Sequence, residues 1–133
     1  MSQSRKPTDP GLETTASGAT RRPEILELPL PAGHRFFLRQ TDGTGAGTRH
    51  ELLKARMTLG RTDADILIPD DSISRKHAAI EIYDPDFIYL KDLASTNGTM
   101  LNGELINAAK LRHGDEVRLG DRRLVFEIER SAA

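Results

Sequence analysis

Residues 78–90 read AAIEIYDPDFIYL, and this stretch decides the fold class. In its first half, Ala78, Ile80 and Ile82 recur at every second position, which is the period expected of a strand with one buried face. The sequence Asp84-Pro85-Asp86 is a turn signal, and the alternation resumes in the apolar residues that follow it. The stretch therefore predicts two consecutive strands joined by a tight turn.

Short runs of the same kind follow one another from Arg35 onward. Turn signals separate them at intervals of roughly 8 to 12 residues, and no helical periodicity of useful length appears. The hairpin signal is strongest at Asn102-Gly103, a dipeptide typical of type I′ turns. We therefore predict an all-β sandwich. The expected strands are 35–39, 50–54, 57–59, 66–68, 78–83, 88–90, 100–101, 105–106, 117–119 and 124–128.

Three polar connections between these runs carry the candidate binding groups. They are Gly60-Arg61, Ser74-Arg75-Lys76-His77 and Ser95-Thr96-Asn97-Gly98. A β-sandwich gathers its loops at two ends, so separate connections can meet at one spot. Guanidinium, hydroxyl, amide and tight-turn backbone groups would then surround one pocket that is rich in hydrogen-bond donors. Such a pocket predicts binding of a phosphate group on a partner peptide.

Length and composition indicate one domain with tails. The chain has 133 residues, of which 37% are apolar, so part of its length is expected to lie outside the core. Residues 1–24 contain few apolar side chains and several prolines, and they are expected to form a disordered N-terminal tail. Residues 25–130 are expected to form the folded domain, with 131–133 as a C-terminal tail.

Charge and residue content exclude several function classes. The 19 basic and 20 acidic residues argue against nucleic-acid binding by bulk charge. The absence of cysteine excludes thiolate metal sites, and the four histidines are dispersed, so we expect no metal and no cofactor. No apolar run approaches a membrane span and no secretory signal is visible, so we expect a cytoplasmic protein without membrane contact.

Between about Arg35 and Glu129 the chain contains the motifs Gly60-Arg61, Ile66-Leu67-Ile68, Ser74-Arg75-Lys76-His77-Ala78, the run 92–99, Asn102-Gly103, Leu111, Gly114-Asp115 and Leu119-Gly120. Their order and spacing resemble a forkhead-associated (FHA) domain. This resemblance implies an eleven-stranded, antiparallel-type β-sandwich with binding loops at one end, similar to small bacterial FHA signalling proteins. It also implies recognition of phosphothreonine peptides rather than a small-molecule substrate.

The resemblance assigns a role to each candidate phosphopeptide-binding residue. Arg61 resembles the main phosphate ligand, and its planar fork suits bidentate contact with phosphate oxygens. Ser74 resembles a hydroxyl donor to the phosphate. Arg75 and Thr96 resemble residues that add further contacts, and Asn97 resembles the amide that holds the ligand backbone. The alternatives are an ion pair of Arg61 with a nearby aspartate, and an Arg75 that is merely solvated.

Three further residues are expected to support the site rather than contact the ligand. Gly60 and Gly98 lie in tight connections, and Gly98 permits the positive φ that would present Asn97 at a turn. His77 resembles a structural residue that braces the binding loops by hydrogen bonds.

Two other classes of function, a hydrolase and a phosphorylation-independent scaffold, are alternatives to phosphopeptide binding. Ser74, His77 and either Asp92 or Asp115 contain the residue types of a hydrolase triad, but no nucleophile-elbow pattern accompanies them, and we expect no enzyme. The second alternative is a scaffold or regulator that binds a folded partner through the same loops without phosphorylation.

The tail contains a candidate phosphoacceptor site at Glu13-Thr14-Thr15. This sequence resembles the acidic tail of small bacterial FHA proteins, which a Ser/Thr kinase phosphorylates and which then docks on the protein's own domain. Thr14 and Thr15 are therefore candidate ligands as well as candidate substrates of a kinase. The expected partners are phosphothreonine proteins, either a Ser/Thr kinase or its substrates.

Overall fold

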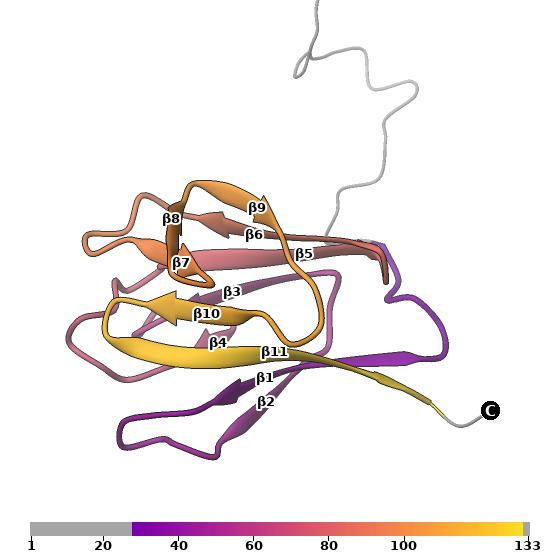
Figure 1. The fold of residues 1–133 in the computed structure, drawn as a ribbon, viewed down its shortest axis with the longest axis horizontal. Coiled ribbons are helices and arrows are strands. Elements are labelled where there is room, and N and C mark those ends of the chain that lie inside the picture. The colour runs from indigo at the N-terminus through magenta and orange to yellow at the C-terminus, as the bar shows by residue number, and fades with distance from the viewer. Residues whose placement is uncertain (1–27, 132–133) are drawn as a thin grey trace, which may run out of the picture.

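The computed structural model describes residues 28–131, which form eleven strands in two stacked sheets (Figure 1). One sheet has six strands in the order β2-β1-β11-β10-β7-β8, and the other has five in the order β4-β3-β5-β6-β9. This architecture confirms the predicted all-β sandwich. The strands are β1 His34–Gln40, β2 Arg49–Leu52, β3 Arg56–Gly60, β4 Ile66–Leu67, β5 Ala78–Asp84, β6 Phe87–Asp92, β7 Thr99–Leu101, β8 Glu104–Ile106, β9 Ala108–Lys110, β10 Glu116–Leu119 and β11 Arg122–Arg130.

The stretch with the clearest alternation forms the centre of the five-stranded sheet. Strands β5 and β6 pair antiparallel, with Ile80 opposite Leu90 and Ile82 opposite Ile88. All four side chains are fully buried between the sheets. Burying such a side chain stabilises the fold by about 1.5–3 kcal/mol, so this face fixes the register of the pair.

The space between the sheets is filled by aliphatic side chains and two phenylalanines. Phe36 and Phe126 stack with their ring centroids 6.4 Å apart, and both are fully buried. The remaining buried members of this core are Leu38, Leu52, Met57, Leu59, Ile66, Ile68, Ile73, Ala78, Ile80, Ile82, Ile88, Leu90, Leu111, Val117, Leu119 and Leu124.

Two features of the strand arrangement differ from the expected one. The short strand β9, Ala108–Lys110, was not among the expected runs, and it pairs with β6 through Leu90 and Ala109. Strands β3 and β4 run parallel rather than antiparallel, with Leu59 opposite Ile66. The expected hairpin at Asn102-Gly103 is present, with positive φ angles of 50° and 87° as a type I′ turn requires.

The outer surface of the six-stranded sheet carries a layer of ion pairs that we call the ionic face. Phe37 points outward here, yet only 4% of it is exposed, because Arg35 and Arg49 lie over its ring at 5.1 and 3.5 Å from the centroid. Each guanidinium group on this face is paired with at least one carboxylate. Its charged members are Arg35, Arg39, Arg49, Glu51, Glu127 and Glu129.

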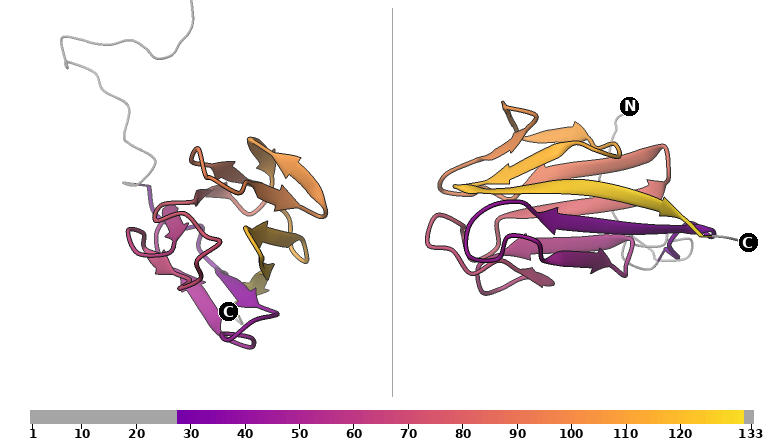
Figure 2. Two further views of the ribbon diagram at one scale, coloured as in Figure 1. Left: turned by 90° about the vertical axis from the view of Figure 1, so that its left-hand side faces the viewer. Right: turned by 60° about the horizontal axis from the view of Figure 1, so that its bottom comes forward.

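The two ends of the sandwich differ in which connections they hold (Figures 1 and 2). Because β3 and β6 both run antiparallel to β5, the connections after β3, before β5 and after β6 lie at one end, which we call the loop end. The described chain begins and ends at the opposite end. Between residues 28 and 131, no helix is long and apolar enough to cross a membrane.

The predicted domain boundaries fall mostly beyond the described range. The expected tail of residues 1–24, with Thr14 and Thr15, lies outside the described residues, as do residues 25–27 and 132–133. Ser131 is described, and its N–H donates to the carbonyl of Gly33 at 2.8 Å. The last strand therefore stays attached to the start of β1.

Candidate functional site

Strand β3 ends at Gly60, where the chain packs closely against the connection between β4 and β5. A Cβ built on Gly60 would lie 2.1 Å from the carbonyl oxygen of Arg75, so a larger residue would force the two segments apart. Beyond this point the backbones are joined: the N–H of Arg61 donates to Ser74 O at 2.9 Å, and that of Asp63 to Arg75 O at 3.0 Å. Residues 61–63 and 74–75 therefore form one surface.

Arg61 is oriented by a backbone carbonyl rather than by a carboxylate. Its Nε donates to Ile73 O at 3.0 Å, which leaves the terminal nitrogens of the guanidinium for other partners. Among residues 28–131 no ion pair within 4.0 Å involves Arg61, because Asp63 and Asp65 pair with lysines instead. The alternative assignment of Arg61 to a surface ion pair with these aspartates is thus not what the described structure shows.

His77 connects the loops from inside the domain. The ring is fully buried; its Nδ1 accepts the N–H of Ser74 at 3.0 Å, and its Nε2 donates to the carbonyl of Gly98 at 2.8 Å. These roles require the proton on Nε2. The backbone of His77 is bonded on both sides as well, since its N–H donates to Leu59 O and its carbonyl accepts the N–H of Leu93. One side chain thus links the connection before β5 to the connection after β6.

The connection after β6 is organised around the carboxylate of Asp92. This carboxylate accepts hydrogen bonds from the N–H and hydroxyl of Ser95 and from the hydroxyl of Thr99. Burial works against the charged form, but the bonds from Ser95 and Thr99 outweigh it and lower the pKa of Asp92. Ala94 and Gly98 have positive φ angles of 55° and 87°, so the chain turns sharply between them. The turn brings residues 94–98 against the β4–β5 connection.

Polar contacts between the two connections complete the surface. The N–H of Thr96 donates to the hydroxyl of Ser74 at 2.9 Å, and this hydroxyl keeps its own hydrogen for a further acceptor. The side-chain amide of Asn97 donates to Ser72 O at 2.8 Å. The carbonyl oxygen of that amide has no partner among the described hydrogen bonds, so it is available to accept one.

These segments enclose an open hollow of about 470 Å³ at the loop end. Arg61, Ser74, Arg75 and Thr96 line it together, as the sequence predicted, whereas Asn97 lies beside it and is held against Ser72. Asp63, Lys76 and Ala94 complete its lining.

Lys76 and Asp63 also line the hollow, although neither was among the predicted site residues. Lys76 lies 3.9 Å from Asp63, so the site contains one carboxylate that was not expected there. The signal for Lys76 was its place next to Arg75 in the same connection; alternation would have put these two neighbours on opposite sides, whereas both line the hollow. Asp63 carried no comparable signal, because it faces the hollow only through the local path of the β3–β4 loop.

The residues of the hypothetical hydrolase triad do not form one. The ring of His77 uses its two nitrogens on the backbone of Ser74 and Gly98, so no base is presented to the Ser74 hydroxyl. The carboxylate of Asp92 accepts hydrogen bonds within its own turn, and the carboxylate of Asp115 accepts one from the side-chain amide of Asn102. The arrangement offers donors to an anion rather than a nucleophile to a substrate.

Comparisons with known proteins agree with this geometry. A sequence profile described as FHA domain matches residues 57–120. The chain is similar to the glycogen accumulation regulator GarA of Mycobacterium tuberculosis, with 35% identity over 127 residues that cover 95% of this chain and 72% of GarA. It is equally similar to an oxoglutarate dehydrogenase inhibitor of Corynebacterium efficiens, with 35% identity over an alignment of 138 positions, gaps included, that covers 95% of this chain and 96% of that one.

Solved structures extend this similarity to the fold. A domain from a structural and functional analysis of phosphothreonine-dependent FHA domain interactions superposes with a TM-score of 0.62 at 33% identity, covering 70% of this chain and 95% of that one. Mycobacterium tuberculosis EmbR, solved in complex with a low-affinity phosphopeptide, superposes with a TM-score of 0.64 at 29% identity, covering 74% of this chain and 26% of EmbR. The chain therefore belongs to the FHA domain family.

Proposed function

We propose that the hollow at the loop end holds the phosphate of a phosphothreonine peptide. In this assignment Arg61, Arg75 and the hydroxyls of Ser74 and Thr96 donate to the phosphate oxygens, and Lys76 adds a further positive charge. The observation that carries the proposal is that Arg61 and Arg75 line the hollow without an ion-pair partner among residues 28–131. Unmatched guanidinium groups around a solvent-open hollow suit a dianion better than any neutral ligand.

A small number of bonds can account for useful affinity at such a site. Hydrogen bonds to a charged group contribute about 1.5–3 kcal/mol each, and Arg61 can supply two of them from its terminal nitrogens. Its direction is set in advance by Ile73 O, so little side-chain freedom is lost on binding. We therefore assign Arg61 the largest single share of phosphate binding.

Asn97 is proposed to hold the peptide backbone beside the phosphothreonine. Its amide nitrogen already donates to Ser72 O, so the carbonyl oxygen is the group that faces an incoming peptide N–H. Ser72 is itself fixed, because its hydroxyl accepts the N–H of Asp121 at 2.8 Å. This chain of contacts would present the amide in one orientation.

The proposal is tested by titration with matched peptides. An oriented phosphothreonine peptide library first selects a sequence, and calorimetry then compares its phosphothreonine, phosphoserine and unphosphorylated forms on the full chain. We expect binding only of the phosphorylated forms, with the amide signals of Arg61, Ser74 and Thr96 shifted in the NMR spectrum. Equal binding of the unphosphorylated form would overturn the assignment of the hollow to phosphate.

We further propose that the physiological ligands are a Ser/Thr kinase, its substrates and the protein's own tail phosphorylated at Thr14 or Thr15. Because such kinases use ATP, this signalling is assigned to the cytoplasm. The 13 positions from Thr15 to Leu28 extend to about 45 Å, while the seven residues of β5 span about 23 Å. The tail can therefore reach the loop end from the opposite end. Tethering would give an effective concentration on the order of mM.

Phosphorylation of the full chain tests this self-docking. If the tail docks, signals of Arg61, Ser74 and Asn97 shift on phosphorylation, and the shifts do not depend on protein concentration. Replacement of Thr14 and Thr15 by alanine removes them. Unchanged signals in the phosphorylated chain would exclude the tail as a ligand while leaving binding of external phosphopeptides intact.

A phosphorylation-independent contact with a folded partner is the second candidate function. The observation that favours it is Leu105, which is 72% exposed at the loop end and lies against Gly98. At such a contact Leu105 would supply an apolar centre beside the polar hollow. Replacing Leu105 by serine would then weaken capture of a folded partner while leaving phosphopeptide affinity unchanged.

A further inference from the structure

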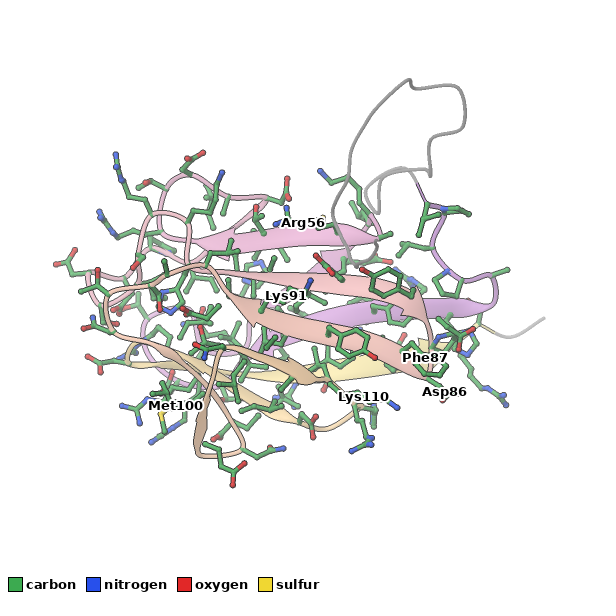
Figure 3. All side chains as sticks on the ribbon, turned by 90° about the horizontal axis from the view of Figure 1, so that it is seen from above. Arg56, Asp86, Phe87, Lys91, Met100 and Lys110 are labelled. Carbon is green, nitrogen blue, oxygen red and sulfur yellow. The ribbon has the colours of Figure 1, made fainter. Side chains whose placement is uncertain are left out.

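The outer surface of the five-stranded sheet carries a second group of exposed side chains, far from the hollow. Figure 3 looks onto this surface and shows Arg56, Lys91, Phe87 and Lys110 on it. In register across the strands, Arg56 lies opposite Glu81, Glu81 opposite Tyr89, and Tyr89 opposite Lys110. We call this surface the aromatic face; its members are Arg56, Glu81, Tyr83, Phe87, Tyr89, Lys91 and Lys110.

The aromatic rings on this face are open to solvent. Phe87 is 52% exposed and Tyr83 is 47% exposed, although Tyr83 also packs edge-on against Tyr89 at 6.1 Å. On the ionic face of the other sheet the outward-pointing Phe37 is only 4% exposed, because two arginines cover it. Over Phe87 a single ammonium group lies at 5.0 Å from the ring centroid, that of Lys110. The aromatic face is thus the less covered of the two.

Apart from the exposed Asp84 and Asp86 at the β5–β6 turn, which borders it, the same face has more positive than negative charge. Its single carboxylate, Glu81, is 6% exposed and is shared between Lys91 at 2.9 Å and Arg56 at 3.4 Å. Lys110 has no ion-pair partner among the described residues. Burial and the hydrogen bond to Glu81 raise the pKa of Tyr83 to about 12, so this phenol adds no negative charge. An acidic segment with apolar side chains would complement the surface in both respects.

The chain has such a segment immediately before its first described residue. Residues 24–27 read Glu-Ile-Leu-Glu, which combines two carboxylates with two branched aliphatic side chains. The described chain begins at the end of the sandwich that holds the β5–β6 turn (Figure 1). Leu30, near this start, is partly buried and packs against the core. Four residues extend to about 14 Å, so the segment has access to the nearer part of the aromatic face.

We propose that residues 24–27 dock on the aromatic face, with Ile25 and Leu26 against Tyr83 and Phe87 and the two glutamates near its cations. This contact does not depend on phosphate binding at the loop end. It would cover the exposed rings and lay the N-terminal tail over the outer surface of β5 and β6. These strands extend between the loop end, which holds the hollow, and the end of the sandwich where the described chain begins (Figure 1).

The absence of tryptophan from the chain allows a specific test by fluorescence. Phe87→Trp places a single reporter on the aromatic face of the full chain, and Leu105→Trp places one at the loop end as the matched control. Each is measured with the native tail and with Ile25→Ser plus Leu26→Ser. Because the ring at position 87 would lose most of its solvent contact, we expect the serine pair to raise acrylamide quenching there by about two-fold and to leave position 105 unchanged.

A second measurement needs no change on the face itself. In the otherwise unmodified chain, Ile25→Ser plus Leu26→Ser should shift the ring signals of Tyr83 and Tyr89, and Glu24→Lys plus Glu27→Lys should shift the same signals. The proposal would be overturned if acrylamide quenching at position 87 were the same with the native and the substituted tail and if the tyrosine signals did not shift. Protection that disappears on dilution would overturn it too, because it would assign the face to a second copy of the chain.

Discussion

The arginines of the ionic face and those of the loop end differ in what their guanidinium groups contact. On the ionic face, Arg35 forms a two-point pair with Glu51 at 2.8 and 3.0 Å, and Arg39 bonds Glu127 at 3.0 Å. At the loop end, Arg61 bonds only a backbone carbonyl through its Nε. Arg75 lines the hollow with no ion-pair partner among the described residues.

This difference separates structural charges from charges that are open to a ligand. A guanidinium that already pairs with a carboxylate must lose that partner before it can bind an outside anion. Arg61 has no carboxylate partner among the described residues, so it can bind an anion without that loss. Net charge could not reveal this, because the whole chain carries only −1. The position of the unmatched cations, rather than their number, therefore identifies the binding site.

The largest expected effect comes from removing the buried support of the loop end. His77→Ala would leave the N–H of Ser74 and the carbonyl of Gly98 without their partners inside the domain. Two buried unpaired groups and the cavity should lower the free energy of unfolding by about 2–5 kcal/mol. Urea unfolding measures the loss. The control is His113→Ala, an exposed residue between β9 and β10 whose ring accepts the N–H of Ile128 in β11, and its effect should be much smaller.

The next largest effect would come from placing a carboxylate directly beside Arg61, so that this arginine is paired as the arginines of the ionic face are. Ser74→Asp keeps an acceptor for the N–H of Thr96 but places a negative charge beside Arg61. Repulsion of the phosphate should weaken phosphopeptide binding by more than about 100-fold, since like charges at an interface cost several kcal/mol. Calorimetry with the uncharged Ser74→Asn as control isolates the charge; equal affinities of the two variants would argue against a phosphate in the hollow.

The turn at Asp92 should make the loop end sensitive to acid. Because hydrogen bonds lower the pKa of Asp92 in the folded state, its contribution to stability is present above the unfolded value of about 3.8 and is lost as the pH falls through the folded value. We expect Asp92→Asn to reduce stability at pH 7 and to flatten the decline below pH 4. Urea unfolding between pH 7 and 3 measures both; parallel curves for the two proteins would exclude this role.

The smallest effect is expected on the ionic face. Glu51→Gln removes the charge opposite Arg35, whose side chain is 54% exposed. Pairs this open to solvent contribute little to the free energy of unfolding, so we expect a small loss of thermal stability and an unchanged phosphopeptide affinity. Thermal unfolding and calorimetry on the same samples check both statements. A loss of affinity here would remove the distinction between the two groups of arginines.

Much of the fold could be predicted because its central strands have a strong period of two. The alternation at Ile80 and Ile82 and the dipeptide Asn102-Gly103 both determined local structure as expected. Strand β9, Ala-Ala-Lys, is too short for any periodicity, and it forms only because β6 offers an open edge. The parallel pairing of β3 with β4 likewise depends on the loop between them and not on a pattern within either strand.

The site was predictable to the extent that its motifs are local in sequence. Arg61, Ser74, Arg75 and Thr96 meet as expected because each follows or precedes a strand at the same end of the sandwich. The hydrogen bond between Asn97 and Ser72 is different, since it joins residues 25 positions apart through the packing of two loops. The same holds for Asp63, whose place in the hollow is set by tertiary contacts.

The central claim is tested most directly by calorimetry of the selected phosphothreonine peptide with the Arg61→Ala and Arg35→Ala variants, both shown to be folded by their NMR spectra. If the unmatched guanidinium of Arg61 binds the phosphate, its loss weakens affinity by about 10- to 100-fold, as expected of charge-assisted hydrogen bonds, while Arg35→Ala binds as the native chain does. Unchanged affinity of folded Arg61→Ala, or an equal loss in both variants, would contradict the account.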